Sequence, residues 1–312
     1  MRLPSAFLLL TVLSVSAFAG DGVIEINQAA AAAGGVTPGD AAGLPVTLSE
    51  SGSYRLTGNL ALPDENTGGI LITADHVTVD LGGFAIIGPT FCTSVPNTPT
   101  TTCGPTGSGD GISGDLPGGF APENITIRNG TVRGAGNRGI TLIFGRVERV
   151  RVISNGSSGI EVPIGLATDG EAPGTAIVES WAIRNGFKGI AAGQRGRVEN
   201  SIASFNGDLG IDCGQSCVVR GNTANWNGAG GIFCSGCVVE NNAVDSNTGA
   251  GITAGRSVVR GNTVINNTGF GLVLNGASGF AENVLSTNAG GTVDGGGFET
   301  GGNVCNGTVT CP

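Results

Sequence analysis

The stretch Val239-Glu240-Asn241-Asn242-Ala243-Val244-Asp245-Ser246-Asn247-Thr248-Gly249-Ala250-Gly251-Ile252 decides the fold, because variants of it recur through the C-terminal half of the chain. One aliphatic position repeats after gaps of 20, 30, 21, 21, 20, 20 and 21 residues, at Ile140, Ile160, Ile190, Ile211, Ile232, Ile252, Leu272 and Val293. An Asn lies five residues before seven of them, at Asn155, Asn185, Asn206, Asn227, Asn247, Asn267 and Asn288. So short a period leaves no room for two packed helices in each repeat. It predicts a coil of short strands that stacks on itself.

A single turn can be assigned from the alternation of its residues. Val259 and Val264 suit inward positions on two short strands, and a corner at Asn262 separates them. Leu272 and Leu274 suit inward positions on a third strand, since alternate residues of a strand share a face. Gly and Asn tolerate the left-handed backbone of corners. We expect stacked Asn side chains to hydrogen-bond from turn to turn and aliphatic stacks to fill the interior.

The motif V-x-x-N-x-(V/A)-x-x-N-x-x-x-G-I resembles the repeat of right-handed parallel β-helix proteins of the pectin-lyase-like superfamily. Residues 77–84 (VTVDLGGF) resemble the first coil of exported bacterial proteins of this kind. The resemblance covers about residues 50–300. It implies an all-β fold, a single-stranded right-handed parallel β-helix with 20–21 residues in most turns. It is weak for activity, because one fold hosts many functions.

The chain divides into segments around this repeat. Residues 1–19 read as an export signal, residues 20–50 as an N-terminal cap, residues 51–300 as the β-helix and residues 301–312 as a disulfide-closed tail. Within the cap, the Ala-rich residues 28–33 predict a short helix that covers the open end of the solenoid. Regular coils are expected from Tyr54, and insertions at 88–122 and 163–174 interrupt them.

The composition of the chain excludes some classes of binding partner. The net charge is −9, and loss of Arg2 with the export signal makes it −10. This balance disfavours nucleic acid and anionic membrane surfaces, which attract Lys and Arg. No stretch is long and apolar enough to span a bilayer. Together with the export signal, this favours a secreted, periplasmic or cell-surface protein. The segments expected to cover its ends favour a monomer over a filament subunit.

Carbohydrate is the ligand that the resemblance implies, yet catalytic motifs are missing. The paired Asp, Gly-His-Gly and Arg-x-Lys pattern of polygalacturonase-like hydrolases does not occur, nor does the Arg-x-Pro-x-x-Arg pattern of pectate lyases. His76, the only His, follows Asp75. A general base is one interpretation of His76, and a turn residue on the first coil is the favoured one.

Two carboxylates form the candidate catalytic pair. Residues that follow the aliphatic column should point outward, and among them Glu161 and Asp212 lie two turns apart. At about 4.8 Å per turn this is about 10 Å, close to the spacing of inverting glycosidases. Asp169 and Glu171 in the second insertion are further candidates. The alternative is solubilising charge on a face where the preceding column, all Gly, has no side chains to build a pocket.

Aromatic residues give the candidate ligand-binding positions. Phe205 and Trp226 occupy equivalent places in successive turns, with Arg184 one turn earlier. They suit stacking on sugar rings or, alternatively, packing against one another at a corner.

Eight cysteines in an exported chain predict disulfides, at Cys92, Cys103, Cys213, Cys217, Cys234, Cys237, Cys305 and Cys311. Cys92 and Cys103 are expected to pin the first insertion, and Cys305 and Cys311 the tail. The four central cysteines also have the spacing of a zinc site, but export and stacking favour disulfides within or between turns.

No resident cofactor is expected. Calcium is implied only if the protein is a lyase, since the Gly-Asp pattern at 107–115 is one imperfect copy of a calcium repeat. The sequence favours a binding or structural solenoid that acts on extracellular or envelope glycans. The alternative is a polysaccharide lyase, hydrolase or epimerase.

Overall fold

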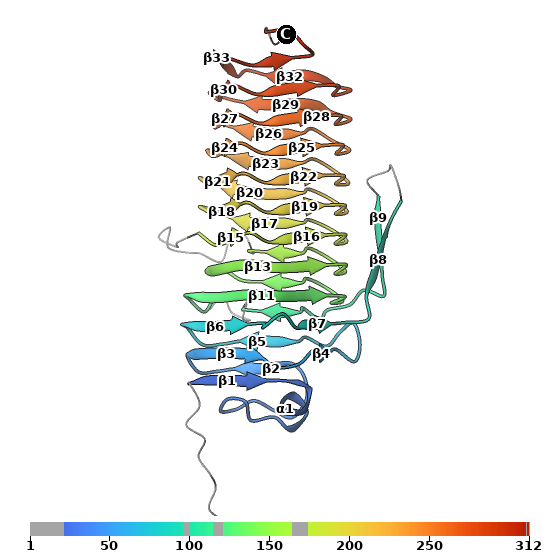
Figure 1. The fold of residues 1–312 in the computed structure, drawn as a ribbon, viewed down its shortest axis with the longest axis vertical. Helices are drawn as coiled ribbons and strands as arrows, with labels where there is room; N and C mark the ends of the chain where they lie inside the picture. The colour runs from blue at the N-terminus through green and yellow to red at the C-terminus, as the bar shows by residue number, and fades with distance from the viewer. Residues whose placement is uncertain (1–21, 96–99, 115–120, 164–173, 310, 312) are drawn as a thin grey trace, which may run out of the picture.

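The protein is a solenoid of parallel strands, described by a computed structural model over residues 22–95, 100–114, 121–163, 174–309 and 311. Short strands stack as rungs along one axis (Figure 1). An eleven-stranded sheet contributes one strand per turn. Its strands are β2 (Val46–Leu48), β5 (Ile70–Ile72), β10 (Ile112–Ser113), β12 (Ile140–Thr141), β14 (Ile160–Glu161), β17 (Ile190–Gly193), β20 (Ile211–Gln215), β23 (Ile232–Ser235), β26 (Ile252–Gly255), β29 (Phe270–Asn275) and β32 (Gly291–Gly295).

A 21-stranded sheet supplies the two remaining strands of a regular turn. It contains β1 (Val23–Ile26), β3 (Gly52–Leu56), β4 (Leu60–Ala61), β6 (Val77–Asp80), β7 (Ala85–Ile87), β11 (Ile125–Arg133), β13 (Gly145–Ile153), β15 (Ala176–Val178), β16 (Trp181–Ile183), β18 (Arg197–Glu199), β19 (Ile202–Ser204), β21 (Val218–Arg220), β22 (Thr223–Asn225), β24 (Val238–Glu240), β25 (Ala243–Asp245), β27 (Val258–Arg260), β28 (Thr263–Ile265), β30 (Gly279–Ala281), β31 (Val284–Ser286), β33 (Phe298–Gly301) and β34 (Val304–Cys305). The nine-residue strands β11 and β13 run through both of its ladders and join them.

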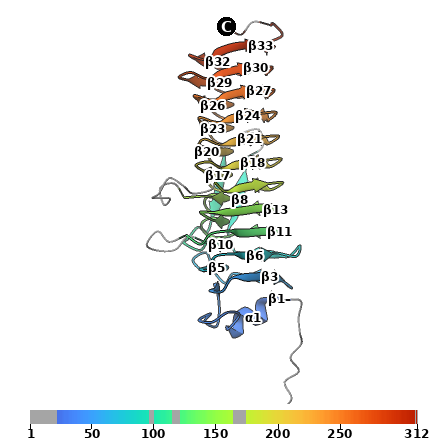
Figure 2. The same cartoon turned by 90° about the vertical axis from the view of Figure 1, so that its left-hand side faces the viewer.

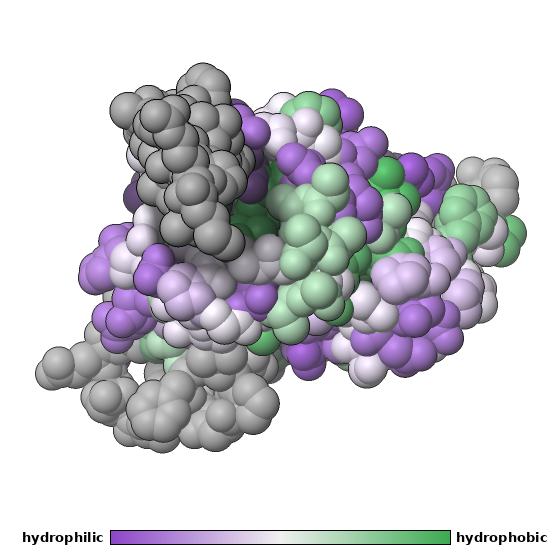
Figure 3. All heavy atoms as spheres, turned by 90° about the horizontal axis from the view of Figure 1, so that it is seen from below, coloured by the Kyte–Doolittle hydropathy of each residue, from purple (hydrophilic) through white to green (hydrophobic). Residues whose placement is uncertain are grey.

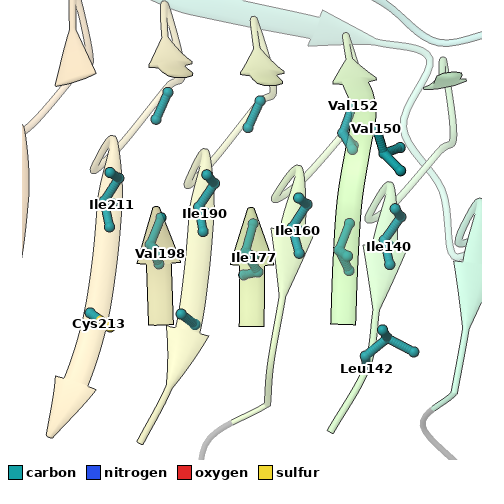
Figure 4. Close-up of a cluster of buried hydrophobic side chains, with 14 of the residues drawn as sticks. Ile140, Leu142, Val150, Val152, Ile160, Ile177, Ile190, Val198, Ile211 and Cys213 are labelled. Atoms are coloured by element: carbon teal, nitrogen blue, oxygen red, sulfur yellow. The ribbon is translucent and has the colours of Figure 1, made fainter. Parts of the chain in front are cut away.

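The repeated aliphatic column is confirmed as an interior stack. Ile140, Ile160, Ile190 and Ile211 are register partners in successive parallel pairings, and each is at most 1% exposed. Figure 4 shows these side chains in one row, facing Val152, Ile177 and Val198 from the other sheet. The register continues to Val293. The twenty-residue period therefore places like residues directly over one another.

Buried asparagines form a second interior column, as the sequence predicts. From Asn155 to Asn267, each side-chain Nδ2 donates at 2.9–3.0 Å to the Oδ1 of the next turn's Asn, and the ladder ends at Asn288. Asn206 uses its whole capacity: its Oδ1 accepts from Asn185 N and Nδ2, and its Nδ2 donates to Ala182 O and Asn227 Oδ1. A second ladder at the other corner joins Asn222, Asn242, Asn262, Asn283 and Asn303.

The glycine column differs from the expected outward strip, because it packs against the Asn ladder. A Cβ at Gly189 would lie 2.5 Å from Asn206 Nδ2 and 2.7 Å from Gly210 O. Glycine is thus required where the ladder and the next turn's backbone approach the strand. The Cβ positions of this column therefore point into the interior, and the column is not part of the outer face.

The N-terminal end is covered by α1 (Gln28–Ala33), the predicted capping helix (Figures 1 and 2). Asn27 caps it by accepting from Ala29 N and Ala30 N, and Gly34 ends it with a φ of 71°. Seen along the axis from this end, hydrophilic and weakly hydrophobic residues are mixed (Figure 3). The strands β1 and β2 already belong to the two sheets, so stacking begins before Tyr54.

The first insertion contains an antiparallel hairpin of β8 (Phe91–Ser94) and β9 (Thr101–Gly104), which extends beside the solenoid (Figure 1). Cys92 and Cys103 form a disulfide across it. Thr101 Oγ1 donates to Phe205 O, which fixes the hairpin against a distant turn. Part of the expected loop, β10, belongs to the eleven-stranded sheet.

The cysteines fall into two groups. Cys305 and Cys311 form a disulfide near the C-terminus. Cys213, Cys217, Cys234 and Cys237 differ from the expectation: they are free thiols, each at most 3% exposed, within the solenoid. They fill interior positions as small apolar side chains would. Its hydrogen bond with Cys213 is the largest of the causes that raise the pKa of the Cys217 thiol, and the hydrogen bond with Cys237 and burial add to it.

Removal of one ladder amide should destabilise the stack. Asn206→Ala leaves the buried groups of Asn185, Ala182 and Asn227 without partners, so we expect a loss of about 3 kcal/mol in the free energy of unfolding. Asn275→Ala, a change at an exposed Asn of β29, is the matched control and should cost under about 0.5 kcal/mol. Urea unfolding followed by circular dichroism measures both. Equal losses would contradict the role of the ladder.

The thiol assignment predicts a labelling pattern. The folded protein should resist a maleimide, because the four central thiols are buried. After denaturation without a reductant, mass spectrometry should find four labels, and after reduction eight. A count of zero before reduction would instead establish disulfides among the central cysteines.

Candidate functional site

The outer face of the eleven-stranded sheet carries the candidate carboxylates. Glu161 pairs in register with Ala191, and Ala191 with Asp212, so the two acids lie two turns apart in one outward column. At about 4.8 Å per turn they are separated by about 10 Å along the axis. The periodicity therefore placed them correctly relative to each other.

A second column lies next to the first and pairs with it. Its residues immediately precede the Gly-Ile pair of each turn, and each can be matched with the outward residue of the next turn. Three of these matched pairs are in contact. We call these pairs rungs and the five of them the strip: Asp110/Thr141, Arg138/Glu161, Ser158/Ala191, Lys188/Asp212 and Leu209/Phe233.

Two rungs are ion pairs. Arg138 Nε lies 3.2 Å from Glu161 Oε1, and Lys188 Nζ lies 2.6 Å from Asp212 Oδ2. The side chains of Lys188 and Asp212 are 22% and 10% exposed. Each candidate acid is thus held beside a cation.

The first rung is a neutral–acidic hydrogen bond. Thr141 Oγ1 donates to Asp110 Oδ2 at 3.0 Å, and Arg138 N donates to Asp110 Oδ1 at 3.0 Å. Burial raises the pKa of Asp110, and these hydrogen bonds oppose the rise. A shallow pocket of about 300 Å³ adjoins this rung, lined by Asn66, Ser108 and Asp110 among others.

The central rung has no internal partner. Ser158 is fully buried, and its Oγ makes no hydrogen bond. Arg138 Nε, one turn earlier, also lacks a partner in hydrogen-bond geometry despite its proximity to Glu161. In the described part of the chain, only one further buried side-chain polar atom, Thr292 Oγ1, is in this state. Such groups are rare in native structures and mark positions that water or a ligand satisfies.

Two exposed aromatic rings border the ion pairs. Phe187 is 45% exposed, and Lys188 Nζ lies 5.4 Å from its ring centre. Phe233 is 42% exposed and is the register partner of Asp212. Neither ring was among the ligand-binding positions predicted from the sequence, and neither were the cations Arg138 and Lys188. Opposite charges one turn apart at the rung positions were the signal that could have identified these pairs.

The sequence-predicted aromatic group lies elsewhere. Phe205 and Trp226 are stacked, with ring centres 6.1 Å apart and planes 5° apart, and Arg184 lies 5.7 Å from the Phe205 ring centre. All three have positive φ at the corner beside the first Asn ladder. Both faces of the Phe205 ring are therefore occupied by neighbours, and the group packs at a corner beside the hairpin.

The other chemical candidates do not join the strip. His76 has positive φ at a corner of the 21-stranded sheet, and its Nδ1 lies 2.9 Å from Asn124 Nδ2. Asp75 Oδ1 accepts from Glu123 N. Asp169 and Glu171 lie outside the described residues. Among the residues that are described, no three Cys, His, Asp or Glu side chains converge to hold a metal ion.

The outer face of the 21-stranded sheet carries a different charge pattern. A register column there runs Asp80, Arg128, Glu148, Val178, Glu199, Arg220, Glu240 and Arg260. Glu240 pairs with Arg220 at 2.6 Å and Arg260 at 2.8 Å, and Arg128 pairs with Asp80 at 3.1 Å. The Arg side chains of these pairs are exposed to solvent, and the carboxylates neutralise cations that would otherwise attract anions.

Within the described ranges, no helix has the length and apolar character needed to cross a membrane.

Comparison with known proteins agrees with the fold. Residues 164–304 match the family model described as a right-handed beta helix region. No curated protein matches the chain significantly. Among solved structures, the A-module of mannuronan C-5 epimerase AlgE4 from Azotobacter vinelandii is 16% identical, with a TM-score of 0.59 over 78% of this chain and 72% of that one.

Two further solved structures are similar at the same level. Pectate lyase Pel9A is 16% identical, with a TM-score of 0.57 over 84% of this chain and 74% of its own. A double mutant of the periplasmic alginate epimerase AlgG is 14% identical, with a TM-score of 0.58 over 82% and 76%. At such identities the likeness establishes the fold alone. The resemblance drawn from the repeat is confirmed: the chain is a right-handed parallel β-helix protein, and no specific enzyme family is matched.

Proposed function

We propose that this protein is an exported, rigid β-solenoid that binds extracellular or envelope glycans through the strip. The observation that carries the proposal is the Lys188–Asp212 ion pair between the exposed rings of Phe187 and Phe233. Aromatic rings accept the apolar faces of sugars, and an adjacent ion pair offers donors and acceptors to their hydroxyl groups. A stacked sheet supports these groups on a rigid base, which lowers the entropic cost of binding.

The fold neighbours give this proposal its ligand class. Their names identify them as enzymes that act on mannuronan, pectate and alginate, which are all polysaccharides. A β-helix presents one long face along its axis, and a linear polymer suits such a face. The transfer of ligand class rests on fold analogy, so the strip residues carry the argument.

Export is part of the proposal. Two disulfides, Cys92–Cys103 and Cys305–Cys311, suit an oxidising compartment. One of the fold neighbours is named as periplasmic. The N-terminal residues 1–19, which read as an export signal, lie outside the described residues.

Binding is favoured over catalysis by the state of the two acids. A general acid or base must be free to reach the reacting atom, and the carboxylates of Glu161 and Asp212 are instead engaged by Arg138 and Lys188. No His lies in the strip to replace them, since His76 is at a corner of the other sheet. The groups present recognise a ligand better than they transfer its protons.

Ring removal tests the binding proposal. Phe233→Ala and Phe187→Ala should each weaken retention of the bound glycan about tenfold, because each loses a stacking surface. Affinity electrophoresis through gels that contain plant, algal or microbial glycans measures this. Phe298→Ala is the matched control, since Phe298 is 67% exposed on β33, outside the strip. Equal retention of all three variants and the wild type would contradict the assignment of the strip.

The enzyme alternative has one observation in its favour, the spacing of Glu161 and Asp212 by two turns. About 10 Å lies just beyond the 6.5–9.5 Å or so of inverting glycosidases. We expect no reducing-sugar release and no unsaturated product from the same glycans, with calcium present. Turnover that Glu161→Gln or Asp212→Asn abolishes would establish an enzyme instead.

A further inference from the structure

We infer that the 21-stranded sheet carries a second binding surface, which takes a glycan with separate carboxylate or sulfate groups. The surface lies on the ladder of this sheet that begins with β4 and β7 and continues through β11, β13, β16 and β19. It is on the other sheet from the strip, so it goes beyond the binding proposed above. We call it the basic face and define it by six residues, Arg133, Arg151, Ile153, Trp181, Ile183 and Arg184.

Register places these residues on one surface. Arg133 pairs with Ile153, and Ile153 with Ile183, so these three share an outward column. Arg151 pairs with Trp181 in the neighbouring outward column, two residues earlier along each strand. Arg133 and Arg151 are therefore one turn and two residues apart, which corresponds to about 8 Å between their Cα atoms.

The side chains of the basic face are accessible. Arg133 and Arg151 are exposed, and Trp181 is 37% exposed. A shallow pocket of about 190 Å³ adjoins Arg151 and Trp181. Arg184, at the corner that directly follows β16, is exposed as well. A ligand that lies along this ladder can therefore reach all three arginines.

These arginines have donors to offer, because none has a carboxylate partner among the described residues. Arg151 Cζ lies 4.4 Å from the ring centre of Trp181, and Arg184 Cζ lies 5.7 Å from that of Phe205. A guanidinium group that stacks on a ring uses its flat face, and its N–H donors remain at its edge. Stacking also restrains the planar fork, whose geometry suits two oxygens of one anionic group.

Acidic side chains do not compensate the basic face. From β4 to β22, the outward positions of its ladder hold no Asp or Glu, and the first acid of the ladder is Asp245 on β25. Glu179 lines the pocket, but it lies 4.0 Å from Arg149, which shares the pocket. The other ladder of the sheet differs, because each arginine of its register column lies beside an acid.

The hairpin β8–β9 runs beside the corner of this ladder (Figure 1). Thr101 Oγ1 donates to Phe205 O, and Cys92 Sγ lies 3.5 Å from Asn155 O. Residues 91–104, which include the hairpin, contain no charged side chain in the sequence. The hairpin therefore borders the basic face without neutralising it.

An acidic glycan suits this surface better than a denser polyanion. Trp181 and the half-buried Ile153 and Ile183 offer apolar area to the faces of sugar rings, while the arginines meet charged substituents. Duplex DNA carries one charge per about 1.7 Å, and a protein with a net charge of −9 repels so dense a polyanion. At about 0.15 M salt, charges more than about 8 Å away are screened, so a sparsely charged chain responds mainly to the local arginines.

The charge preference is tested by affinity electrophoresis through two matched pairs of polymers. One pair is dextran and lightly sulfated dextran, and the other is methyl-esterified pectin and pectin with free carboxylates. The wild type should be retained more by the charged member of at least one pair, and which pair responds identifies sulfate or carboxylate. This extra retention should fall severalfold between about 20 and 300 mM salt, because exposed cations are screened.

The location is tested with two double variants of equal charge. Arg133→Gln/Arg151→Gln should lower the extra retention about tenfold, because it removes two donors of the basic face. Arg195→Gln/Arg256→Gln is the matched control and should lower it less than about twofold. Arg195 and Arg256 are also exposed and without a carboxylate partner, but they lie at the corner that follows the eleven-stranded sheet. Thermal midpoints verify that both variants are folded.

Trp181 provides a local readout. The chain has two tryptophans, so in Trp226→Phe only Trp181 remains. A saturating amount of the retained acidic glycan should change the emission of Trp181, because the ligand engages the guanidinium group that lies over its ring. Unchanged emission together with full retention would place the ligand elsewhere and overturn the inference.

The remaining outcomes separate this surface from the strip. Equal losses in the two double variants would show that overall charge attracts the polymer, and would overturn the inference. Stronger retention by gels that contain duplex DNA than by either acidic glycan would do the same. Equal retention by charged and neutral polymers also overturns it, and leaves glycan binding at the strip to the Phe187→Ala and Phe233→Ala variants.

Discussion

Register between turns is the constraint on which this structure depends, and buried amides enforce it. Asn206 is fully buried and makes four hydrogen bonds, to the turns on both sides. A slip of one residue would break this pattern and turn the interior isoleucines toward solvent. Hydrophobic burial supplies most of the driving force, but it is not directional. The amide ladders select one alignment among those that bury the same residues.

The alignment of interior residues between turns also fixes the positions of the outward residues. Because Ile160 and Ile211 are held in one column, Glu161 and Asp212 must share the adjacent outward column. The rungs of the strip are therefore contacts between residues about one turn apart in sequence, as with Lys188 and Asp212. Outward residues contribute little to the core, so they can change without loss of the fold. This explains why epimerases and a lyase share the architecture at 14–16% identity and why their activities cannot be transferred from it.

The sequence predicted what repeats and missed what does not. The Ile and Asn columns were readable because their period is nearly constant, and the helix at 28–33 because Gly34 and Gly35 end it. The early strands β1 and β2 were missed, since no repeat marks them. The four central cysteines were expected to form disulfides. Their spacing in the sequence predicts that the thiols stack, but it does not show whether they are bonded to one another. The strip was predicted only in part. Its acids were named from the sequence, whereas Phe187 and the cations can be recognised only from the pairing between columns.

Pairing within the strip also separates recognition from catalysis on this scaffold. A carboxylate that transfers a proton must be free to approach the reacting atom, whereas Asp212 is bonded to Lys188 at 2.6 Å. A carboxylate that binds sugar hydroxyls gains from the same cation, because the ion pair holds the acceptor in place. The neighbours of an acid on the β-helix face therefore decide its use more than the spacing between acids. By that criterion Asp212 and Glu161 suit ligand binding better than proton transfer.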